Sequence, residues 1–390
     1  MIPVTDQRAA RAGAALGRCW SRVARALVAC GCVVMAVAQG AGVGAANPVA
    51  RTLPRLTLRQ LVGQRVIYSY PGLTPPATLL SRIRAGEAAG VILFASNISS
   101  RAQIGDVIDR LQAANAASAV RAPLLIMTDQ EGGLVRRLPG APSLSEKQIG
   151  ASAHPLAAAR AAGRGAGRNL RGVGINVNLA PVLDVFRAPG DFIDRFGRSY
   201  SRDPQAVARL GAAFIGAQQA TGVAATAKHF PGLGAATRFQ DTDRRPVTLD
   251  VPLGGLRATD ELPYRSAVSA GVRLVMVSWA RYPALDDHRP AGLSATIVRD
   301  ELRRRMGFAG VTITDALGAG ALRSYGTVGH RAVLAARAGM DLMLCAGQRI
   351  DEATSTIDGL AAALAAGRLD IHVARAAAAR VIALRSAVGA

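Results

Sequence analysis

Two cationic side chains, Lys228 and His229, stand together at the end of a short apolar run, and two carboxylates follow them. A Pro-Gly pair and a flexible stretch separate them from Asp241 and Asp243. The chain has only one other lysine, Lys147. Burying a lysine without polar or anionic partners is costly. Lys228 is therefore expected either to pair with a neighbouring carboxylate or, with His229, to hold a polar ligand. The spacing alone does not choose between the two.

Other short apolar runs also end close to polar side chains, which are Asp129, Asp184, Trp279 and Asp315. A carboxylate at the end of a strand can accept hydrogen bonds from ligand hydroxyls, and it can also act as a nucleophile. In isolation, Asp315 is better explained as the N-cap of the helix that follows it.

The elements that must position these side chains are short strands alternating with longer helical stretches. Eight apolar, β-branched-rich runs are predicted as strands: 65–70, 90–95, 124–128, 175–180, 223–227, 273–278, 311–314 and 341–345. Between them the helical period predicts helices such as 101–117, 155–170, 204–220, 295–305 and 329–338. Asp203 followed by Pro204 is a strong start signal for the helix at 204–220.

This alternation indicates a parallel sheet covered on its faces, and eight units favour a single-domain (β/α)8 barrel of the TIM type. The alternative is an open, doubly wound sheet. An open sheet gathers its ligand groups near one switch point and often carries a phosphate-binding glycine fingerprint. Here the polar residues are spread over several strand ends, and no such fingerprint follows the first strand.

The composition narrows the class of protein. The chain has 390 residues and a formal net charge of +21, carried almost wholly by arginine. The arginines are scattered and form no nucleic-acid-binding motif, so a nucleic-acid partner is not expected. Of four cysteines, all but Cys345 lie within the first 46 residues. The histidines and Cys345 show no metal-ligand spacing, so no metal site is expected.

Residues 1–46 are predicted to be an export leader, and residues 47–390 the barrel domain. Several arginines precede an apolar run at 26–38, and small residues follow it. This run is short for a membrane-spanning helix. The protein is therefore expected to be exported, either secreted or associated with the cell envelope. It would be attached to a membrane only if the leader is retained or lipidated.

Six motifs, taken in order along the chain, resemble glycoside hydrolase family 3, in particular its single-domain β-N-acetylhexosaminidases. They are TDQEGGLVRRL (128–138), NLAPVLDV (178–185), GRSYSRDP (197–204), KHFPGLG (228–234), RYPALD (281–286) and GVTITDALGAGAL (310–322). The resemblance covers nearly the whole chain after the leader. It implies a (β/α)8 barrel that hydrolyses terminal β-linked sugars, with retention of configuration, through a covalent glycosyl-aspartate. No cofactor is implied.

The resemblance also implies roles for particular residues. Asp315, in ITDAL, corresponds to the catalytic nucleophile. The residues corresponding to those that bind the sugar are Asp129, Arg137, Arg198, Lys228 and His229. Asp184 is expected to have a structural role, bonding its own loop.

Two departures from the family pattern affect these roles. Leu134 stands where DQEGG is usually followed by arginine. In the loop after KHFPG, the family's Asp-Ser-His triplet, whose histidine is the general acid/base, is absent. Asp241-Thr242-Asp243 stands two residues later, and the next histidine is His288. Asp243, or alternatively Asp241, is the candidate acid/base, provided that burial or a nearby like charge raises its pKa.

The function that this resemblance implies is that of a retaining β-glycosidase, and the expected enzyme is a β-N-acetylglucosaminidase of cell-wall or chitin-type fragments. The alternatives are a non-catalytic sugar-binding protein on the same scaffold, or a β-glucosidase or glycoside phosphorylase of the same family. Oligomeric state is left open.

Overall fold

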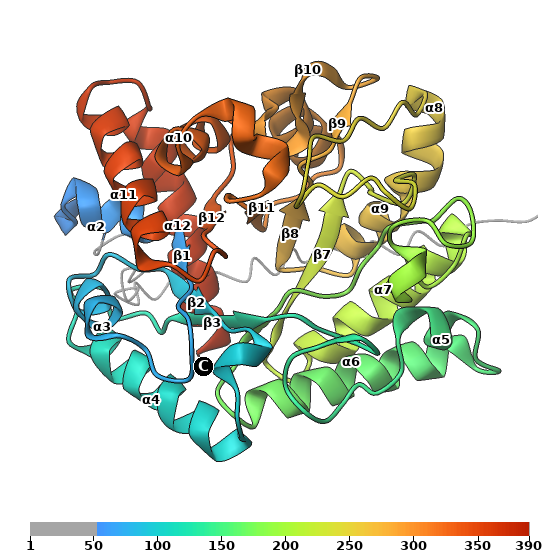
Figure 1. The fold of residues 1–390 in the computed structure, drawn as a ribbon, viewed down its shortest axis with the longest axis horizontal. Coiled ribbons are helices and arrows are strands. Elements are labelled where there is room, and N and C mark those ends of the chain that lie inside the picture. Colours follow the sequence, from blue (N-terminus) through green and yellow to red (C-terminus); the bar gives the residue numbers. More distant parts are fainter. Residues whose placement is uncertain (1–52, 390) are drawn as a thin grey trace, which may run out of the picture. The chain divides into compact units, whose positions relative to one another are not determined.

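The computed structural model describes residues 53–389, which contain a closed barrel of eight parallel strands (Figure 1). The strands are β1 (Val66–Tyr68), β2 (Gly90–Ile92), β3 (Leu125–Thr128), β6 (Val177–Asn178), β7 (Ala224–Phe230), β8 (Leu274–Val277), β11 (Val311–Ala316) and β12 (Leu342–Leu344). They neighbour one another in chain order, and β12 closes the ring by pairing in parallel with β1. The predicted barrel and its eight strands are confirmed, and the open sheet is excluded.

The strands are apolar almost throughout because both of their faces are buried. In β3, Leu125 and Met127 belong to the cluster that fills the barrel interior. Leu124 and Ile126, which alternate with them, belong to the cluster packed beneath the surrounding helices. Successive side chains of a strand point to opposite faces, so a strand between two apolar layers reads as a continuous apolar run.

Helices form the outer layer around the strands (Figure 1). The α-helices are α2 (Leu58–Gly63), α3 (Ala77–Arg84), α4 (Arg101–Ala116), α5 (Glu146–Gly150), α6 (Pro155–Arg171), α7 (Pro204–Gln219), α8 (Leu253–Gly255), α9 (Leu262–Ser269), α10 (Val328–Ala338), α11 (Ile350–Ala365) and α12 (Ile371–Val388). Shorter or wider helical turns are η1 (Leu53–Arg55), η2 (Ala95–Asn97), η3 (Asp194–Phe196), η4 (Leu256–Asp260), η5 (Ala291–Leu293), η6 (Thr296–Arg305) and η7 (Gly320–Tyr325).

The predicted start of α7 is confirmed, because the Asp203 carboxylate accepts a hydrogen bond from the backbone N–H of Gln205 at 2.9 Å and Pro204 is the first helical residue.

Two predicted strands are longer than expected, which changes where their polar residues lie. β7 continues to Phe230, so Lys228 and His229 belong to the strand itself rather than to the loop after it. The reason is continued pairing: Leu183 N donates to Lys228 O at 2.7 Å, and Ser278 N donates to Phe230 O at 2.9 Å. β11 likewise continues past the predicted residue 314 to Ala316 and therefore includes Asp315.

Two small antiparallel hairpins stand outside the barrel sheet. One pairs β4 (Gln130–Gly132) with β5 (Val135–Arg136), and the other pairs β9 (Arg281–Tyr282) with β10 (Asp286–Pro290). The first requires glycine at position 132, where φ is +114° and a Cβ atom would lie 2.1 Å from the carbonyl oxygen of Leu144. This hairpin packs DQEGG tightly against the chain that follows it.

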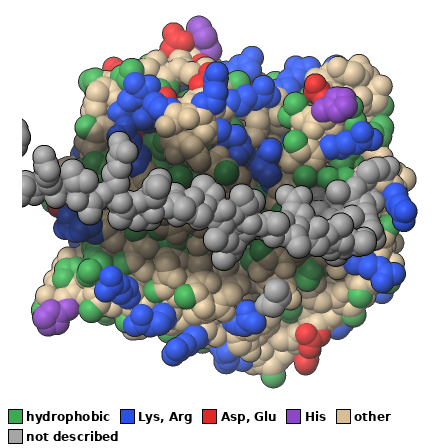
Figure 2. Space-filling model, turned by 180° about the vertical axis from the view of Figure 1, so that it is seen from behind, with side chains coloured by type: hydrophobic (Ala, Val, Ile, Leu, Met, Phe, Trp, Pro, Cys, Tyr) green, Lys and Arg blue, Asp and Glu red, His purple; other side chains and the backbone are tan. Residues whose placement is uncertain are grey.

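The chain carries a formal net charge of +21, and the face seen in Figure 2 is correspondingly basic. Figure 2 shows Lys and Arg side chains spread over one face of the molecule, with few Asp and Glu side chains among them. Within residues 53–389 there is no helix with both the length and the hydropathy needed to span a bilayer. The predicted leader, residues 1–46, lies outside the described residues.

Candidate active site

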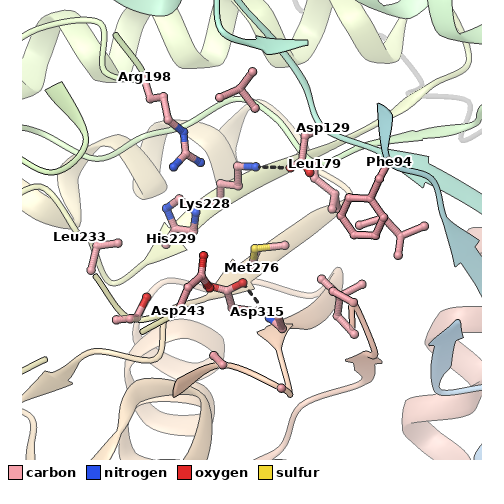
Figure 3. A pocket seen from close by; sticks show the side chains of 18 of the residues that line it. Phe94, Asp129, Leu179, Arg198, Lys228, His229, Leu233, Asp243, Met276 and Asp315 are labelled. Atoms are coloured by element: carbon pink, nitrogen blue, oxygen red, sulfur yellow. Dashed lines mark hydrogen bonds and ion pairs between the residues drawn. The ribbon is translucent and has the colours of Figure 1, made fainter. Parts of the chain in front are cut away.

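The carboxyl ends of the barrel strands surround a cavity of about 460 Å³. Its lining comes from residues at or just after seven of the eight strands, including Phe94, Asp129, Leu179, His229, Met276, Asp315 and Ala346. Seven of the residues singled out from the sequence line this one cavity: Asp129, Arg137, Arg198, Lys228, His229, Asp243 and Asp315. In Figure 3, Arg198, Lys228 and His229 lie toward one side of the cavity, and Asp243 and Asp315 lie next to each other across from them.

One side of the cavity is a network of buried charges. The Lys228 ammonium group contacts Asp129 Oδ1 at 2.7 Å and Glu131 Oε1 at 2.8 Å. Arg198 donates from Nε and Nη2 to the two oxygens of Glu131, both at 2.9 Å. The sequence left open whether Lys228 pairs with a carboxylate or holds a ligand. In the structure Lys228 pairs with Asp129 and also lines the cavity.

Glu131 is the centre of this network and was not assigned a role from the sequence. Its side chain is 2% exposed. Burial raises the pKa of Glu131, but the charges of Arg198 and Lys228 outweigh burial and bring the pKa down to about 2. The only sequence signal for this role was its place in the DQEGG motif. Glu131 takes up Nε and Nη2 of Arg198, so within residues 53–389 Nη1 is the guanidinium nitrogen left for a ligand.

A second polar contact fixes the ring of His229. Its Nδ1 lies 2.7 Å from Asp184 Oδ2, and Asp184 Oδ1 accepts hydrogen bonds from the backbone N–H groups of His229 and Leu233. Asp184 was expected to bond its own loop; instead its side chain holds β7 and the start of the loop after β7. A carboxylate at Nδ1 keeps the proton on that nitrogen and leaves Nε2 for the cavity.

Asp315 lies at the end of β11, where the backbone is held in place on both sides. Its Oδ1 accepts a hydrogen bond from Ala316 N at 2.7 Å. The buried indole of Trp279 donates to Ala316 O at 2.9 Å, and Leu317 N donates to Leu344 O at 3.0 Å. These contacts tie the segment that carries Asp315 to β8 and β12, the strands beside it.

The loop after β7 brings Asp243 to the same place, because it docks on the segment that follows Asp315. Gly320 N donates to Asp243 O at 2.7 Å, and Ala321 N donates to Thr242 O at 3.0 Å. Any side chain at position 320 would interfere, since a Cβ atom there would lie 2.2 Å from the carbonyl oxygen of Arg244. Two carboxylates distant in sequence are thereby held close together.

This proximity changes the acidity of Asp243. The negative charge of Asp315 is the largest cause, followed by burial and the charge of Asp241, and together they raise the pKa of Asp243 to about 6. Asp243 is exposed at the mouth of the cavity, so water screens part of this repulsion when no ligand is bound. A group with a pKa near 6 can exist as a proton donor close to neutral pH.

The other two acid/base possibilities lie outside the cavity lining. Asp241 stabilises its own turn instead, accepting from Asp243 N at 3.0 Å and lying 3.6 Å from Arg244 Nε. His288 lies on β10, where its side chain is 86% exposed and contacts the exposed Asp287. Of these groups, only Asp243 faces Asp315.

The departure at Leu134 has little effect on the cavity. Leu134 stands in the turn between β4 and β5, with 76% of its surface exposed. Arg137, the first residue after β5, lines the cavity. The Nε of Arg137 is buried and has no hydrogen-bond partner among the described residues, so it is a donor that a ligand can satisfy. The apolar part of the lining, which includes Phe94, Phe192 and Met276, was not predicted from the sequence.

No group of three or more His, Cys, Asp or Glu side chains within residues 53–389 is placed to hold a metal ion. What the cavity offers is a pair of neighbouring carboxylates facing a set of fixed hydrogen-bond donors. Such an arrangement can bind the hydroxyl groups of a small polar ligand and can perform acid–base or nucleophilic chemistry on it.

Comparison with known proteins agrees with this description. The family model "Glycosyl hydrolase family 3 N terminal domain" matches residues 57–384. An uncharacterized secreted glycosyl hydrolase of Arthroderma benhamiae is 46% identical over 330 residues, covering 84% of this chain and 93% of that protein. A beta-hexosaminidase of Xanthomonas oryzae is 36% identical over 279 residues, covering 70% of this chain and 80% of that protein.

Among solved structures, a family 3 β-N-acetylglucosaminidase from Paenibacillus superposes with a TM-score of 0.81 and 36% identity. The match covers 86% of this chain and 64% of that enzyme, so this chain spans less than two thirds of its length. The barrel, the cavity at its carboxyl end and the matched family model together show that this chain is a glycoside hydrolase and belongs to glycoside hydrolase family 3.

Proposed function

We propose that this protein is a retaining β-N-acetylglucosaminidase that removes terminal β-linked sugars, with Asp315 as the nucleophile and Asp243 as the general acid/base. The observation that carries the proposal is the pairing of these carboxylates in one cavity, where Asp315 raises the pKa of Asp243 to about 6. A retaining glycosidase needs one ionised and one protonated carboxyl group flanking the scissile bond.

In the first step, a carboxylate oxygen of Asp315 attacks the anomeric carbon. The bond from that carbon to the glycosidic oxygen breaks as the new carbon–oxygen bond forms, and the Asp243 carboxyl group gives its proton to the leaving oxygen. The products of this step are the free alcohol, a glycosyl ester on Asp315 and an ionised Asp243.

In the second step, Asp243 acts as a base. It takes a proton from a water molecule, whose oxygen attacks the anomeric carbon and displaces the Asp315 carboxylate. The sugar is released with its original configuration, and Asp243 is again protonated. Once the ester has formed, Asp315 no longer carries the charge that raised the pKa of Asp243, so Asp243 stays ionised until it acts as the base.

The remaining polar residues of the cavity bind the sugar. Asp129 accepts hydrogen bonds from sugar hydroxyl groups, and its contact with Lys228 at 2.7 Å fixes the orientation of its carboxylate. Lys228 and Arg198 donate to neighbouring hydroxyls, and Nε2 of His229 accepts from one. Arg137 adds a further donor, its Nε, which has no partner within residues 53–389. Charge-assisted hydrogen bonds of this kind are short and directional, so they hold the ring in one position for attack.

We assign the substrate to terminal β-linked N-acetylglucosamine of chitin-type or cell-wall fragments. The support is the similarity to proteins called beta-hexosaminidase and β-N-acetylglucosaminidase. We further propose that residues 1–46 are an export leader, so that the enzyme acts outside the cell or in its envelope. The similar Arthroderma benhamiae protein is called a secreted glycosyl hydrolase.

The proposal is tested with aryl β-N-acetylglucosaminide, aryl β-glucoside and N,N′-diacetylchitobiose as substrates. Asp315→Ala should abolish turnover of all three, and a 2-deoxy-2-fluoro glycosyl inactivator should label Asp315 of the wild-type protein. Asp243→Asn should slow hydrolysis of the disaccharide far more than that of an activated aryl glycoside, because only the disaccharide needs a proton donor. Asp241→Asn is the matched control and should have a small effect on both.

Other outcomes point to the alternatives. Sugar binding without turnover or labelling would indicate a binding protein. Preference for the aryl β-glucoside would indicate a β-glucosidase, and a rate that depends on added phosphate would indicate a phosphorylase. Activity of Asp315→Ala with unchanged stereochemistry would refute the assignment of the nucleophile.

A further inference from the structure

The loop between β7 and α8 carries an aromatic side chain that almost nothing covers. Phe239 is 70% exposed, and among the large apolar side chains of the described residues only Leu134 is more exposed. A single exposed apolar residue is common on protein surfaces and needs no special explanation. The position of this one does need an explanation, because it lies four residues before Asp243 on the same loop.

The loop is anchored on both sides of Phe239. Before it, Ala236 O accepts a hydrogen bond from Phe192 N at 3.0 Å. After it, the carbonyl groups of residues 242–243 accept from Gly320 and Ala321 at 2.7 and 3.0 Å. The chain between these anchors is thus held at the rim of the cavity, since Phe192 and Asp243 both line it.

The turn at the crest of the loop is itself bonded. Gln240 Oε1 accepts from Thr237 N at 2.8 Å, and Gln240 N donates to Thr237 O at 2.9 Å. The guanidinium carbon of Arg238 lies 5.9 Å from the centroid of the Phe239 ring, close enough for a cation–π contact. Phe239 therefore stands on a structured turn, and its ring is presented to solvent.

The role of Asp243 indicates which part of a substrate this ring can meet. A general acid must reach the oxygen of the leaving group, so the loop that carries it borders the leaving-group side of the cavity. On this basis, which rests on the proposed function, we propose that Phe239 is a specificity-determining residue that stacks against the sugar ring of the leaving group.

The chemistry of the two surfaces is compatible with stacking. A β-linked pyranose presents a face of C–H groups, and an aromatic ring is a flat apolar surface with a negative face. Stacking removes both apolar surfaces from water. The enzyme is thereby expected to favour di- and oligosaccharides, whose leaving group is a second pyranose, over glycosides with a small alkyl leaving group.

The test compares N,N′-diacetylchitobiose with methyl N-acetyl-β-glucosaminide. Both release an alcohol that needs the proton of Asp243, but only the disaccharide has a leaving group with a ring. Phe239→Ala is expected to lower the ratio of the two kcat/KM values by about 3- to 10-fold. Phe239→Trp, which keeps an aromatic face, is expected to leave the ratio within about twofold of wild type.

Val373→Ala is the matched control, because Val373 is an exposed apolar side chain, 42% exposed, that lies on α12 and not on the loop that carries Asp243. It should leave the ratio unchanged. Displacement of Asp243 would lower both rates alike, so an equal fall for both substrates in Phe239→Ala would refute stacking, and so would an unchanged ratio. Failure of the wild-type protein to hydrolyse either substrate would instead refute the proposed function.

Discussion

Replacing Glu131 with glutamine should destabilise the protein and weaken its binding of substrate together. One buried carboxylate here balances two buried cations, accepting from Arg198 twice at 2.9 Å and from Lys228 at 2.8 Å. An amide of the same shape has no charge and has one acceptor oxygen in place of two. Its NH₂ group would point a donor at another donor, so at least one cation would lose its partner.

The size of the effect follows from the acidity of Glu131. Its pKa is lowered from 4.5 to about 2 in the folded protein. At 1.36 kcal/mol for each pKa unit, this difference corresponds to about 3 kcal/mol of stability. Because the folded-state pKa is the lower one, this contribution is fully present above pH 4.5 and is lost as the pH falls toward 2. Breaking a buried ion pair by removing one partner costs a similar amount, about 3–5 kcal/mol.

Urea denaturation at pH 7 measures this quantity. Glu131→Gln should lower the free energy of unfolding by about 3 kcal/mol with little change in the m value. The same variant should lower kcat/KM by at least about tenfold, because Arg198 and Lys228 lose the anchor that fixes them in the cavity. At pH 2.5 the difference in stability between the two proteins should be much smaller.

Glu146→Gln is the control, because Glu146 is a neighbouring carboxyl group that is equally buried. Burial, and then the negative charge of Glu131, raises the pKa of Glu146 well above its usual value, so the shift of Glu146 is opposite in direction to that of Glu131. Its Oε1 accepts from Val182 N at 2.9 Å, a bond that glutamine can keep. A loss within about 1 kcal/mol is expected. Equal losses in the two variants, or a loss below about 1 kcal/mol for Glu131→Gln, would refute the reasoning.

Three further outcomes are expected. The kcat/KM for the disaccharide should fall as the pH rises through about 6, where Asp243 loses its proton. In Asp315→Asn, carboxyl NMR should show the pKa of Asp243 lowered toward 3.8. An unchanged pKa of Asp243 would mean that Asp243 and Asp315 do not interact. Asp184→Asn should lower the free energy of unfolding by about 2–3 kcal/mol, measured by denaturation, because its carboxylate holds the ring of the cavity's histidine and two backbone N–H groups. Gly320→Ala places a Cβ atom 2.2 Å from Arg244 O, so it should displace the loop that carries Asp243. Hydrolysis of alkyl glycosides should then slow more than hydrolysis of activated aryl glycosides. Similar losses for both substrates would argue against this role of the loop.

The barrel itself could be predicted from the sequence because its signal is local. Each strand is buried on both faces, so its sequence is a continuous apolar run, and several helices begin at a capping side chain, as α7 does at Asp203. The lengths of β7 and β11 were underestimated, since polar residues such as Lys228 and Asp315 end an apolar pattern before they end the pairing of the strand. Propensity records what a residue prefers, whereas strand length is decided by the neighbouring strand.

The candidate site was only partly accessible to the same reasoning. That strand-end side chains such as Asp129, Lys228 and Asp315 would share one cavity followed from the parallel barrel, in which all carboxyl ends meet at one face. The barrel fold did not predict that Glu131 would hold two of the cations. It also did not predict that Asp184 would hold the loop after β7. These contacts join residues far apart in the sequence, and no local pattern specifies them.

The choice between Asp241 and Asp243 shows most clearly what the sequence determines and what the tertiary structure determines. By itself, the sequence determined that two carboxylates stand where the family has a histidine-containing triplet, and that a raised pKa would be required for either to act as an acid. Only the tertiary structure decided that Asp243 faces Asp315 while Asp241 closes its own turn. The physical reason is that the pKa of a carboxyl group depends on the charges and the water around it in space, and the order of residues along the chain does not fix those.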